Sequence, residues 1–512
     1  MLKQVIILCA LLSSQVALPT QAQPLSQSGQ VEKAAQAEQA AQTANPDLPA
    51  EDKTTKPILA LLSAFNSAQA DQIKQFIREY TDKDFQSAMP IAEHVAQFQS
   101  VARQYGKFHF IALKSVPKKG NVTIKLLQVK DSAYGDYHEI TLIFNDDAAP
   151  RFVDIRPRLM KAAPENAANN AANAEESKLI QQSLQLVKIG CEKDIFSGSV
   201  MLAKDERVLL KTACGEASKR YHVANNIDTK FNLGSMNKMF TAIAIAQLME
   251  QGKLNYQDTI DQWVDSSWLP KKITSQIKLH HLLTHTSGLE SFFNTTFEKS
   301  AQGQYREVDD LKPLIKDESL RFQPGSDFLY SNTGMHLLGV VIEKVSGQNY
   351  SDYIRQHIYL PAGMLNSDNY AIDEPIENLA IGYMPAFSGK FPWIENTYKY
   401  SMRGGPAGGG YSTAPDLFAF VQALKQTKLL KPETLQTLWT DHNGHRYGYG
   451  FLVKNASTGK VVGHGGAIDG VSAELEMHLD RGYTLIALSN YDYGALHLTR
   501  KISQLIQKMP KA

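Results

Sequence analysis

The sequence has few cysteines and no excess of either charge. Only three of its 512 residues are cysteine, and 53 lysines and arginines stand against 52 aspartates and glutamates, for a formal net charge of +1. A protein with so little net charge lacks the basic field by which nucleic-acid-binding proteins attract phosphate groups. We therefore expect no nucleic-acid partner.

Several catalytic motifs are also missing. The sequence has no Gly-x-Ser-x-Gly turn of the α/β-hydrolases and no Gly-x-x-x-x-Gly-Lys phosphate loop. His281 and His285 have the spacing of metal ligands on a helix, but no glutamate follows His281, and Thr286-Ser287-Gly288 ends any helix there. We therefore expect no metal site and no cofactor, and we interpret this segment as a turn that supports an active-site wall.

Long apolar runs are absent as well, and the most apolar segment near the start is short. Lys3 precedes the apolar residues Val5–Leu12, and Pro19–Ala22 end in a small residue, which is typical of a secretory signal peptide. We predict that residues 1–22 are removed after Ala22, together with Cys9. The mature chain is then predicted to have no integral membrane segment and to be exported, to the periplasm or beyond.

Composition divides the rest of the chain. With 43% hydrophobic and 21% charged residues it is typical of a globular protein, and its length predicts more than one domain. Residues 23–55 are rich in Gln, Ala and Glu and are predicted to be a disordered tether. Residues 161–174 have a similar bias and are predicted to be a linker. The expected domains are therefore residues 56–160 and 175–512.

Residues 56–160 predict a small α+β domain. Apolar residues recur at helical spacing in two stretches, and four strand-like runs follow them. The two helical stretches are Ile58–Tyr80 and Ala88–Tyr105, and the four runs are Phe108–Val116, Val122–Val129, Tyr137–Phe144 and Arg151–Ile155. This element order resembles the cone-like folds of the nuclear-transport-factor and cystatin types. We interpret the domain as a binding or spacer module whose partner the sequence does not identify.

The two cysteines of the mature chain flank a predicted β-hairpin. Its strands are Phe196–Ala203 and Arg207–Ala213, joined by a turn at residues 204–206. Strand pairing places Cys214 near the start of the first strand, with Cys191 several residues beyond. In an exported protein the two can form a disulfide or remain separate buried thiols, and the sequence leaves both open.

A lone lysine stands at the head of an apolar helix. Lys238 is followed by Met239–Met249, which contain no charged residue, and a helix that is apolar on all sides is buried. Burial drives an unpaired ammonium toward the neutral amine, which accepts protons. Ser235 lies three residues earlier and so shares a helix face with Lys238. We predict Ser235 as a nucleophile and Lys238 as its base.

Two later segments carry further polar groups in suitable places. Tyr330 lies between the turn at Pro324-Gly325 and the apolar run Met335–Ile342, so it is expected to project from a loop. A cationic lysine nearby would lower the pKa of its phenol and suit it to proton transfer. The run Val461–Ala467 predicts a strand whose glycines permit the close approach of a ligand or of another backbone segment.

Together these segments resemble a known superfamily. Ser235-Met236-Asn237-Lys238, Tyr330-Ser331-Asn332 and His464-Gly465-Gly466 are similar to the three ordered motifs of the serine β-lactamases and penicillin-binding proteins, in the class C-like branch. Three accessory segments, His281–Leu289, Phe322–Gly325 and Gly408–Ala414, also resemble that branch. The resemblance covers residues from about 175 to the end. It implies an α+β, β-lactamase/transpeptidase-like fold, with an antiparallel sheet flanked by helices and a helical subdomain.

The resemblance also implies roles for individual residues. Tyr330 would be the acid/base partner of the serine and lysine, and Asn332 would contact both the lysine and the substrate. The backbone N–H groups of Ser235 and Ala467 would form the oxyanion hole. The substrate would lie along His464, Gly465, Gly466 and Ala467.

One position departs from the pattern. Relatives that recognise penicillin commonly have a threonine or serine where this chain has Gly465, and that hydroxyl helps to hold the substrate carboxylate. Losing a hydrogen bond to a charged group weakens binding by roughly 1.5–3 kcal/mol. Arg403 could replace it as an anion anchor, but we interpret Arg403 as a solvated surface residue. Esters and amides without a free carboxylate are therefore favoured.

We thus predict an exported serine hydrolase that cleaves ester or amide bonds of a small molecule or peptide through an acyl-enzyme on Ser235. Two alternatives stay open from the sequence. One is a β-lactamase or D-Ala-D-Ala carboxypeptidase, and the other is a non-catalytic protein that binds penicillin or another ligand.

Overall fold

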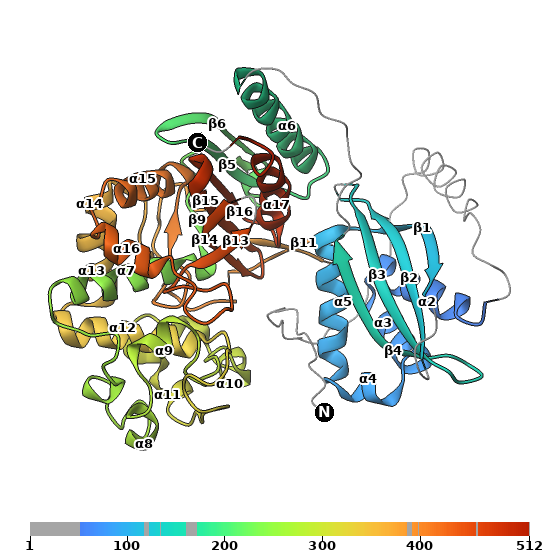
Figure 1. Cartoon of the computed structure of the whole chain (residues 1–512), viewed down its shortest axis with the longest axis horizontal. Helices are drawn as coiled ribbons and strands as arrows, with labels where there is room; N and C mark the ends of the chain where they lie inside the picture. The colour runs from blue at the N-terminus through green and yellow to red at the C-terminus, as the bar shows by residue number, and fades with distance from the viewer. Residues whose placement is uncertain are drawn as a thin grey trace. The chain divides into compact units, whose positions relative to one another are not determined.

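The computed structural model describes most of the chain (Figure 1), namely residues 52–116, 122–133, 135–159, 172–386, 392–397, 399–456 and 459–510. The predicted signal peptide, nearly all of the tether and most of the predicted linker lie outside these residues. Two compact units are present: the small unit, which comprises the described residues 52–159, and the large unit, which comprises those from 172 onward. None of the helices in the described part of the chain has the length and apolar character of a membrane-spanning segment.

The small unit contains helices followed by one antiparallel sheet in the order β1-β2-β3-β4. The helices are α2 (Thr55–Ser67), α3 (Ala70–Tyr80), α4 (Lys83–Ser87) and α5 (Ile91–Tyr105). The strands are β1 (Phe108–Ser115), β2 (Val122–Asp131), β3 (Tyr137–Asn145) and β4 (Phe152–Leu159). Alternate residues of β2 and β3 are buried and join apolar side chains of the helices in one core. The element order agrees with the prediction, and the cone-like type stays a prediction.

The prediction of one helix over Ile58–Tyr80 was wrong. Ala68 follows α2 in the left-handed conformation, with φ of 51°, and its N–H bonds the carbonyl of Ala64, so α2 ends there and α3 starts at Ala70. Left-handed helix ends usually employ glycine. Because the residue at this position is alanine, the sequence did not indicate that the helix ends here.

The large unit is built on a six-stranded antiparallel sheet in the order β13-β14-β15-β16-β5-β6. Its strands are β5 (Gly198–Lys204), β6 (Arg207–Cys214), β13 (Leu452–Ala456), β14 (Gly459–Ile468), β15 (Val471–His478) and β16 (Tyr483–Ser489). The predicted hairpin of β5 and β6 is confirmed. Shorter strands are β7 (Glu216–Ser218), β8 (Val223–Ala224), β9 (Phe231–Asn232), β10 (Tyr383–Pro385), β11 (Trp393–Glu395) and β12 (Tyr411–Ser412).

Helices cover both faces of this sheet. On one face α6 (Ala172–Glu192) and α17 (Gly494–Ile506) form an apolar core with β5 and β16. The other face packs on the larger core, which contains the buried helices α7 (Asn237–Glu250), α12 (Asn332–Ser346) and α15 (Ala414–Lys425). The expected α+β class, with a helix-rich middle segment, is confirmed (Figure 1).

The middle segment also contains shorter helices, most of which surround α7 and α12. They are α8 (Lys271–Thr274), α9 (Leu279–Leu283), α10 (Thr295–Lys299), α11 (Lys312–Ile315), α13 (Tyr350–Ile354), α14 (Leu360–Ala362) and α16 (Pro432–Leu438). Single turns of 3-10 helix occur at Gly234–Met236, Ile260–Gln262, Gln302–Gln304, Val308–Leu311 and Leu479–Arg481, and a π-helical turn at Arg355–Tyr359.

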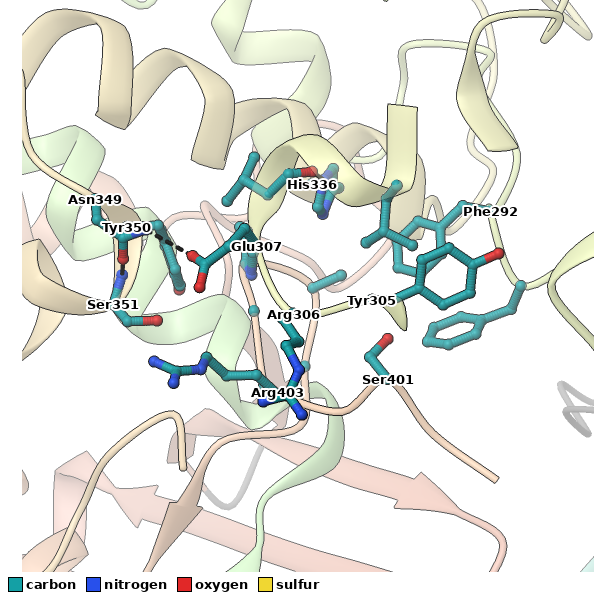
Figure 2. A pocket seen from close by; sticks show the side chains of 18 residues that line it. Phe292, Tyr305, Arg306, Glu307, His336, Asn349, Tyr350, Ser351, Ser401 and Arg403 are labelled. Carbon is teal, nitrogen blue, oxygen red and sulfur yellow. Dashed lines mark hydrogen bonds between the residues drawn. The ribbon is translucent and has the colours of Figure 1, made fainter. Parts of the chain in front are cut away.

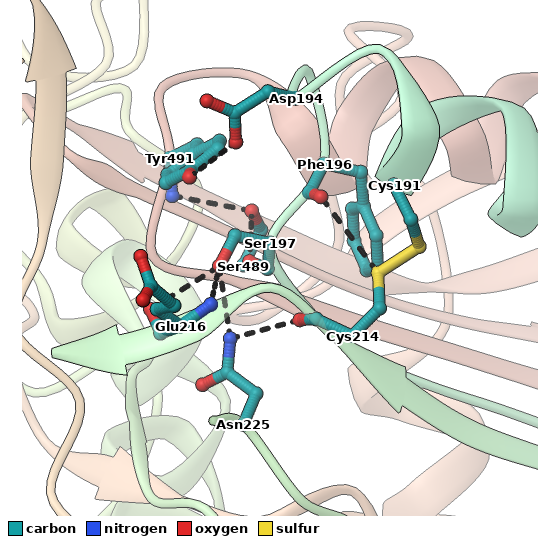
Figure 3. The surroundings of a disulfide bond; sticks show 9 residues. All are labelled: Cys191, Asp194, Phe196, Ser197, Cys214, Glu216, Asn225, Ser489 and Tyr491. Atoms are coloured by element: carbon teal, nitrogen blue, oxygen red, sulfur yellow. Dashed lines mark hydrogen bonds between the residues drawn. A yellow bond between two sulfur atoms is a disulfide. The ribbon is translucent and has the colours of Figure 1, made fainter. Parts of the chain in front are cut away.

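A disulfide joins the two cysteines that the sequence left unassigned. Cys191, near the end of α6, bonds to Cys214 at the end of β6, with their Cα atoms 6.1 Å apart (Figure 3). Helix α6 carries Cys191 back toward the edge of the hairpin, which the strand register alone did not reveal. The bond fixes this helix to the outermost strand of the sheet.

Removing the disulfide is expected to lower the free energy of unfolding. The bond closes a loop with a sequence separation of 23 residues, for which the chain-entropy relation gives roughly 3 kcal/mol. We expect the variant with Cys191→Ser and Cys214→Ser to unfold at a lower denaturant concentration, measured by circular dichroism. Reductant should lower the midpoint of the wild type and leave that of the variant unchanged, and an effect on both would contradict this assignment.

Candidate active site

Ser235 lies in a tight turn that leads directly into α7. The turn is one 3-10 unit, Gly234–Met236, in which Gly234 has φ of 49° and its N–H bonds Oδ1 of Asn232 at 2.9 Å. The N–H of Leu233 bonds the carbonyl of Gly410 at 2.7 Å, and the N–H of Gly409 bonds the carbonyl of Gly234 at 3.1 Å. Backbone segments far apart in sequence therefore fix the position of the serine.

Lys238 is completely buried and contacts three oxygen atoms. Its Nζ lies 2.9 Å from Oγ of Ser235, 2.8 Å from Oδ1 of Asn332 and 2.5 Å from the carbonyl of Ala407. Burial lowers the pKa of this amine well below its usual value, and no carboxylate among the described residues forms an ion pair with it. The predicted contact between the serine and the lysine is present.

The three contacts specify where the lone pair of a neutral amine points. A carbonyl oxygen can only accept a hydrogen bond, so the oxygens of Ala407 and Asn332 use the two N–H groups of the neutral Lys238. The lone pair is then left for Ser235, whose hydroxyl can donate to it. This arrangement suits removal of the serine proton.

Tyr330 lies beside the lysine in the loop before α12. Nζ of Lys238 is 4.8 Å from the centroid of its ring, and the ring of His285 packs on it with centroids 4.3 Å apart. His285 is fully buried, and its Nδ1 accepts a hydrogen bond from the N–H of Ser331 at 3.1 Å. A neutral lysine would not lower the pKa of the phenol as we reasoned from the sequence. It can do so only after it has taken a proton.

Asn332 begins α12, which Ser331 caps by accepting a hydrogen bond from the N–H of Gly334 at 2.8 Å. The side-chain amide of Asn332 donates to Oγ of Ser291 at 3.0 Å, and its oxygen faces Lys238. The predicted contact of Asn332 with the lysine is therefore present. Its contact with substrate stays a prediction.

The imidazole of His464 is buried and has protein partners at both nitrogens. Its Nε2 lies 2.9 Å from the hydroxyl of Tyr447, and its Nδ1 lies 2.5 Å from the carbonyl of Gly465. Burial lowers the pKa of His464 to about 3, so the ring is neutral. It supports Tyr447, whose ring also packs on His285 with centroids 4.6 Å apart.

The glycines of β14 allow that strand to touch the serine turn. A Cβ atom on Gly466 would lie 1.9 Å from the carbonyl oxygen of Leu233 and 2.9 Å from the backbone nitrogen of Ser235. A Cβ atom on Gly234 would lie 3.2 Å from the nitrogen of Ala467. The structure thus brings the backbone at 466–467 against the nucleophile, as the resemblance implied.

A small cavity is lined by the segment Ser401–Gly408, which includes Ala407. It has a volume of about 50 Å³ and is lined in part by Arg306, Tyr350 and Arg403 (Figure 2). Such a volume holds a few water molecules. Arg403 is not the solvated residue that we expected, because its side chain is 24% exposed and pairs with Glu374 at 3.2 Å. Its charge is already matched within the protein.

Sequence reasoning missed several residues of this site. The carbonyl of Ala407, the hydroxyl of Ser291 and the rings of His285 and Tyr447 all contact the predicted residues. The only sign of them was that His285 and Ala407 lie in or beside the accessory segments that resemble the class C-like branch. Their partners lie far away along the chain.

Known proteins share the sequence pattern and fold of the large unit. A family model described as Beta-lactamase matches residues 176–506. Penicillin-binding protein 4* of Bacillus subtilis (strain 168) is 32% identical over 316 residues, which are 58% of this chain and 69% of that protein. The crystal structure of the penicillin binding protein from Bacillus halodurans has a TM-score of 0.57 and 29% identity, covering 64% of this chain and 98% of that one.

A more distant structure shows the same fold. D-amino acid amidase from Ochrobactrum anthropi SV3 matches with a TM-score of 0.55 and 22% identity, over 66% of this chain and all of the other. At this identity the likeness concerns the fold alone. These structures confirm the fold that the sequence resemblance implied.

A single methyl group on Gly466 is expected to disable the nucleophile. In Gly466→Ala the new Cβ would collide with the backbone of the serine turn, and a shift of about 1 Å costs roughly 100-fold in rate. Gly405→Ala is the matched control, because a Cβ there meets nothing within 4 Å. The measurement is the rate at which a fluorophosphonate labels each folded variant. Equal rates for both variants would contradict the packing described here.

Proposed function

Because this chain belongs to the Beta-lactamase family, whose model matches residues 176–506, we propose that it is an exported serine hydrolase that cleaves ester or amide bonds through an acyl-enzyme. The observation that carries the proposal is the contact between the buried Lys238 amine and Oγ of Ser235 at 2.9 Å. A protein that only binds a ligand has no need of a buried amine directed at a hydroxyl.

The proposed reaction has two halves. Ser235 attacks the substrate carbonyl as Lys238 takes its proton, and the backbone N–H groups of Ser235 and Ala467 hold the oxyanion. Tyr330 passes the proton to the leaving group, helped by the positive charge that Lys238 then carries. Water attacks the acyl-enzyme in the second half and the same groups return its proton. Asn332 keeps the amine oriented throughout.

Export is supported by two features. The first 22 residues have the pattern of a signal peptide. Cys191 and Cys214 form a disulfide, and such bonds persist mainly in oxidising compartments outside the cytosol. The substrate would therefore be a small molecule or peptide met outside the cytosol.

The favoured substrates are esters and small or D-configured amides. Gly465 offers no hydroxyl to a substrate carboxylate, and the guanidinium of Arg403 is paired with Glu374. Penicillin binding is the second candidate, supported by the name of the relative at 32% identity. D-Ala-D-Ala carboxypeptidase activity belongs to this same candidate, because it also needs recognition of a carboxylate.

Three probes separate these candidates. We expect the purified protein to be labelled by a fluorophosphonate and to hydrolyse p-nitrophenyl esters or D-amino-acid amides, with little labelling by a fluorescent penicillin. Ser235→Ala should abolish every reaction. Rapid labelling by penicillin would reverse the order of the two candidates, and a folded wild type that no probe labels would contradict hydrolysis.

The acylation rate should report the protonation state of Lys238. Its pKa is lowered, so the amine is neutral above that pKa and protonated below it. We expect a rate that is level above the lowered pKa and falls about tenfold per pH unit below it. Lys238→Met should reduce the rate by roughly 10²–10⁴-fold and remove this profile.

The same variant provides a control for folding. The unfolded lysine binds a proton up to a pKa of about 10.4 and the folded one does not, so this residue makes stability increase with pH across that range. We therefore expect the free energy of unfolding of the wild type to increase relative to that of Lys238→Met as the pH rises toward 10. A difference between the two proteins that does not change with pH would contradict a neutral buried amine.

A further inference from the structure

Gly465 lies where β14 borders the nucleophile. Strand β13 pairs with β14 only over Gly459–Gly463, whereas β15 pairs with it over residues 461–468. Among the described strands, β14 thus has one neighbour from His464 onward. This is the stretch whose Gly466 touches the serine turn. Gly465 precedes Gly466 on this unpaired edge of β14 and faces the opposite side of the sheet. A substrate that extends along this edge from Ser235 would pass Gly465.

The space that a side chain would occupy at Gly465 is filled by a carboxyl group. Gly465 stands directly opposite Glu474 of β15, so the two residues share one face of the sheet. A Cβ atom on Gly465 would lie 2.5 Å from Oε1 of Glu474 and 2.9 Å from its Oε2. A side chain at position 465 would therefore displace this carboxyl.

The positive charges near Glu474 are engaged elsewhere or act from a distance. Glu476, two residues further along β15, bonds Nζ of Lys454 at 2.7 Å and lies 3.3 Å from Nε2 of His478. Lys454 and Arg500 of α17 act on Glu474 only through their charges, and both lower its pKa. Glu474 is 9% exposed, and no ion pair of the described residues includes it. Its charge is thus not cancelled by a partner.

The chemistry at this position is opposite to that of a penicillin-recognising site. A hydroxyl at position 465 can donate a hydrogen bond to a substrate carboxylate, whereas an ionised carboxyl can only accept one. Two carboxylates brought close together in a partly buried site repel each other. A cation or an N–H donor on the substrate would instead form a favourable interaction with the carboxylate of Glu474.

We propose that Glu474 sets the substrate class of this hydrolase, favouring esters and amides whose leaving group carries a cation or a hydrogen-bond donor and disfavouring those that carry a carboxylate. The inference rests on the proposed function and adds a specificity-determining residue to it. Burial, and secondly the charge of Glu476, raises the pKa of Glu474 to about 7. The preference should therefore grow as the pH rises through neutrality.

Three thioesters of N-acetyl-D-alanine test this directly. Their leaving groups are thiocholine, 2-mercaptoethanol and 3-mercaptopropionate, which are cationic, neutral and anionic at every pH between 6 and 9. Thiol release gives kcat/KM for each. We expect the wild type to favour the thiocholine ester over the mercaptopropionate ester at least tenfold at pH 8, with a smaller ratio at pH 6. Any pH dependence of the shared catalytic groups cancels in this ratio.

The variant Glu474→Gln should reduce the ratio at pH 8 about tenfold and remove its change with pH, with the rate for the neutral ester retained. Glu476→Gln is the matched control, because it removes a carboxylate from the same face of the same strand but one that is already paired with Lys454. Its ratio should stay within about twofold of the wild type.

A second variant tests the inference even if Glu474→Gln does not fold. Glu474→Ala combined with Gly465→Ser places a hydroxyl where the carboxyl stood, and we expect it to accept the anionic ester and to label faster with fluorescent penicillin. An unchanged ratio in both Glu474 variants, or a wild type that prefers the anionic ester, would overturn the inference while fluorophosphonate labelling of Ser235 upheld the hydrolase. Absence of that labelling would overturn both.

Discussion

The site depends on one buried amine that has no carboxylate partner among the described residues. Burying Lys238 would be strongly unfavourable if its charge were retained, and the surrounding oxygens of Asn332 and Ala407 satisfy a neutral amine rather than neutralise an ammonium. Lys238 belongs to α7, in which every residue from Asn237 to Ala246 is buried. The nucleophilic character proposed for Ser235 follows from that environment.

The rest of the large unit can be understood as support for this arrangement. The sheet brings β14 against the serine turn, and the segment that contains Ala407 passes over the other side of the amine. His285 and Tyr447 form an aromatic support around Tyr330 and His464. Each of these contacts joins parts of the chain that are far apart, so the site exists only in the folded protein.

The sequence predicted features that depend on neighbouring residues. It did not predict contacts between residues that are far apart in the chain. The spacing of Ser235 and Lys238 is set by helix geometry, and the apolar residues that follow predict its burial. The contact of Lys238 with Ala407 spans 169 residues, and no periodicity encodes it. The disulfide stayed open for the same reason, because it depends on how α6 packs on β6. The helix break at Ala68 lacked the glycine that usually marks one.

The direct test of a neutral lysine is nuclear magnetic resonance of protein labelled with ¹³C and ¹⁵N at lysine, in which the signal missing from Lys238→Met identifies Cε and Nζ of Lys238. We expect chemical shifts of a neutral amine at pH 8, with a titration well below the value of about 10.4 for free lysine. Shifts of an ammonium that persist to pH 10 would contradict it.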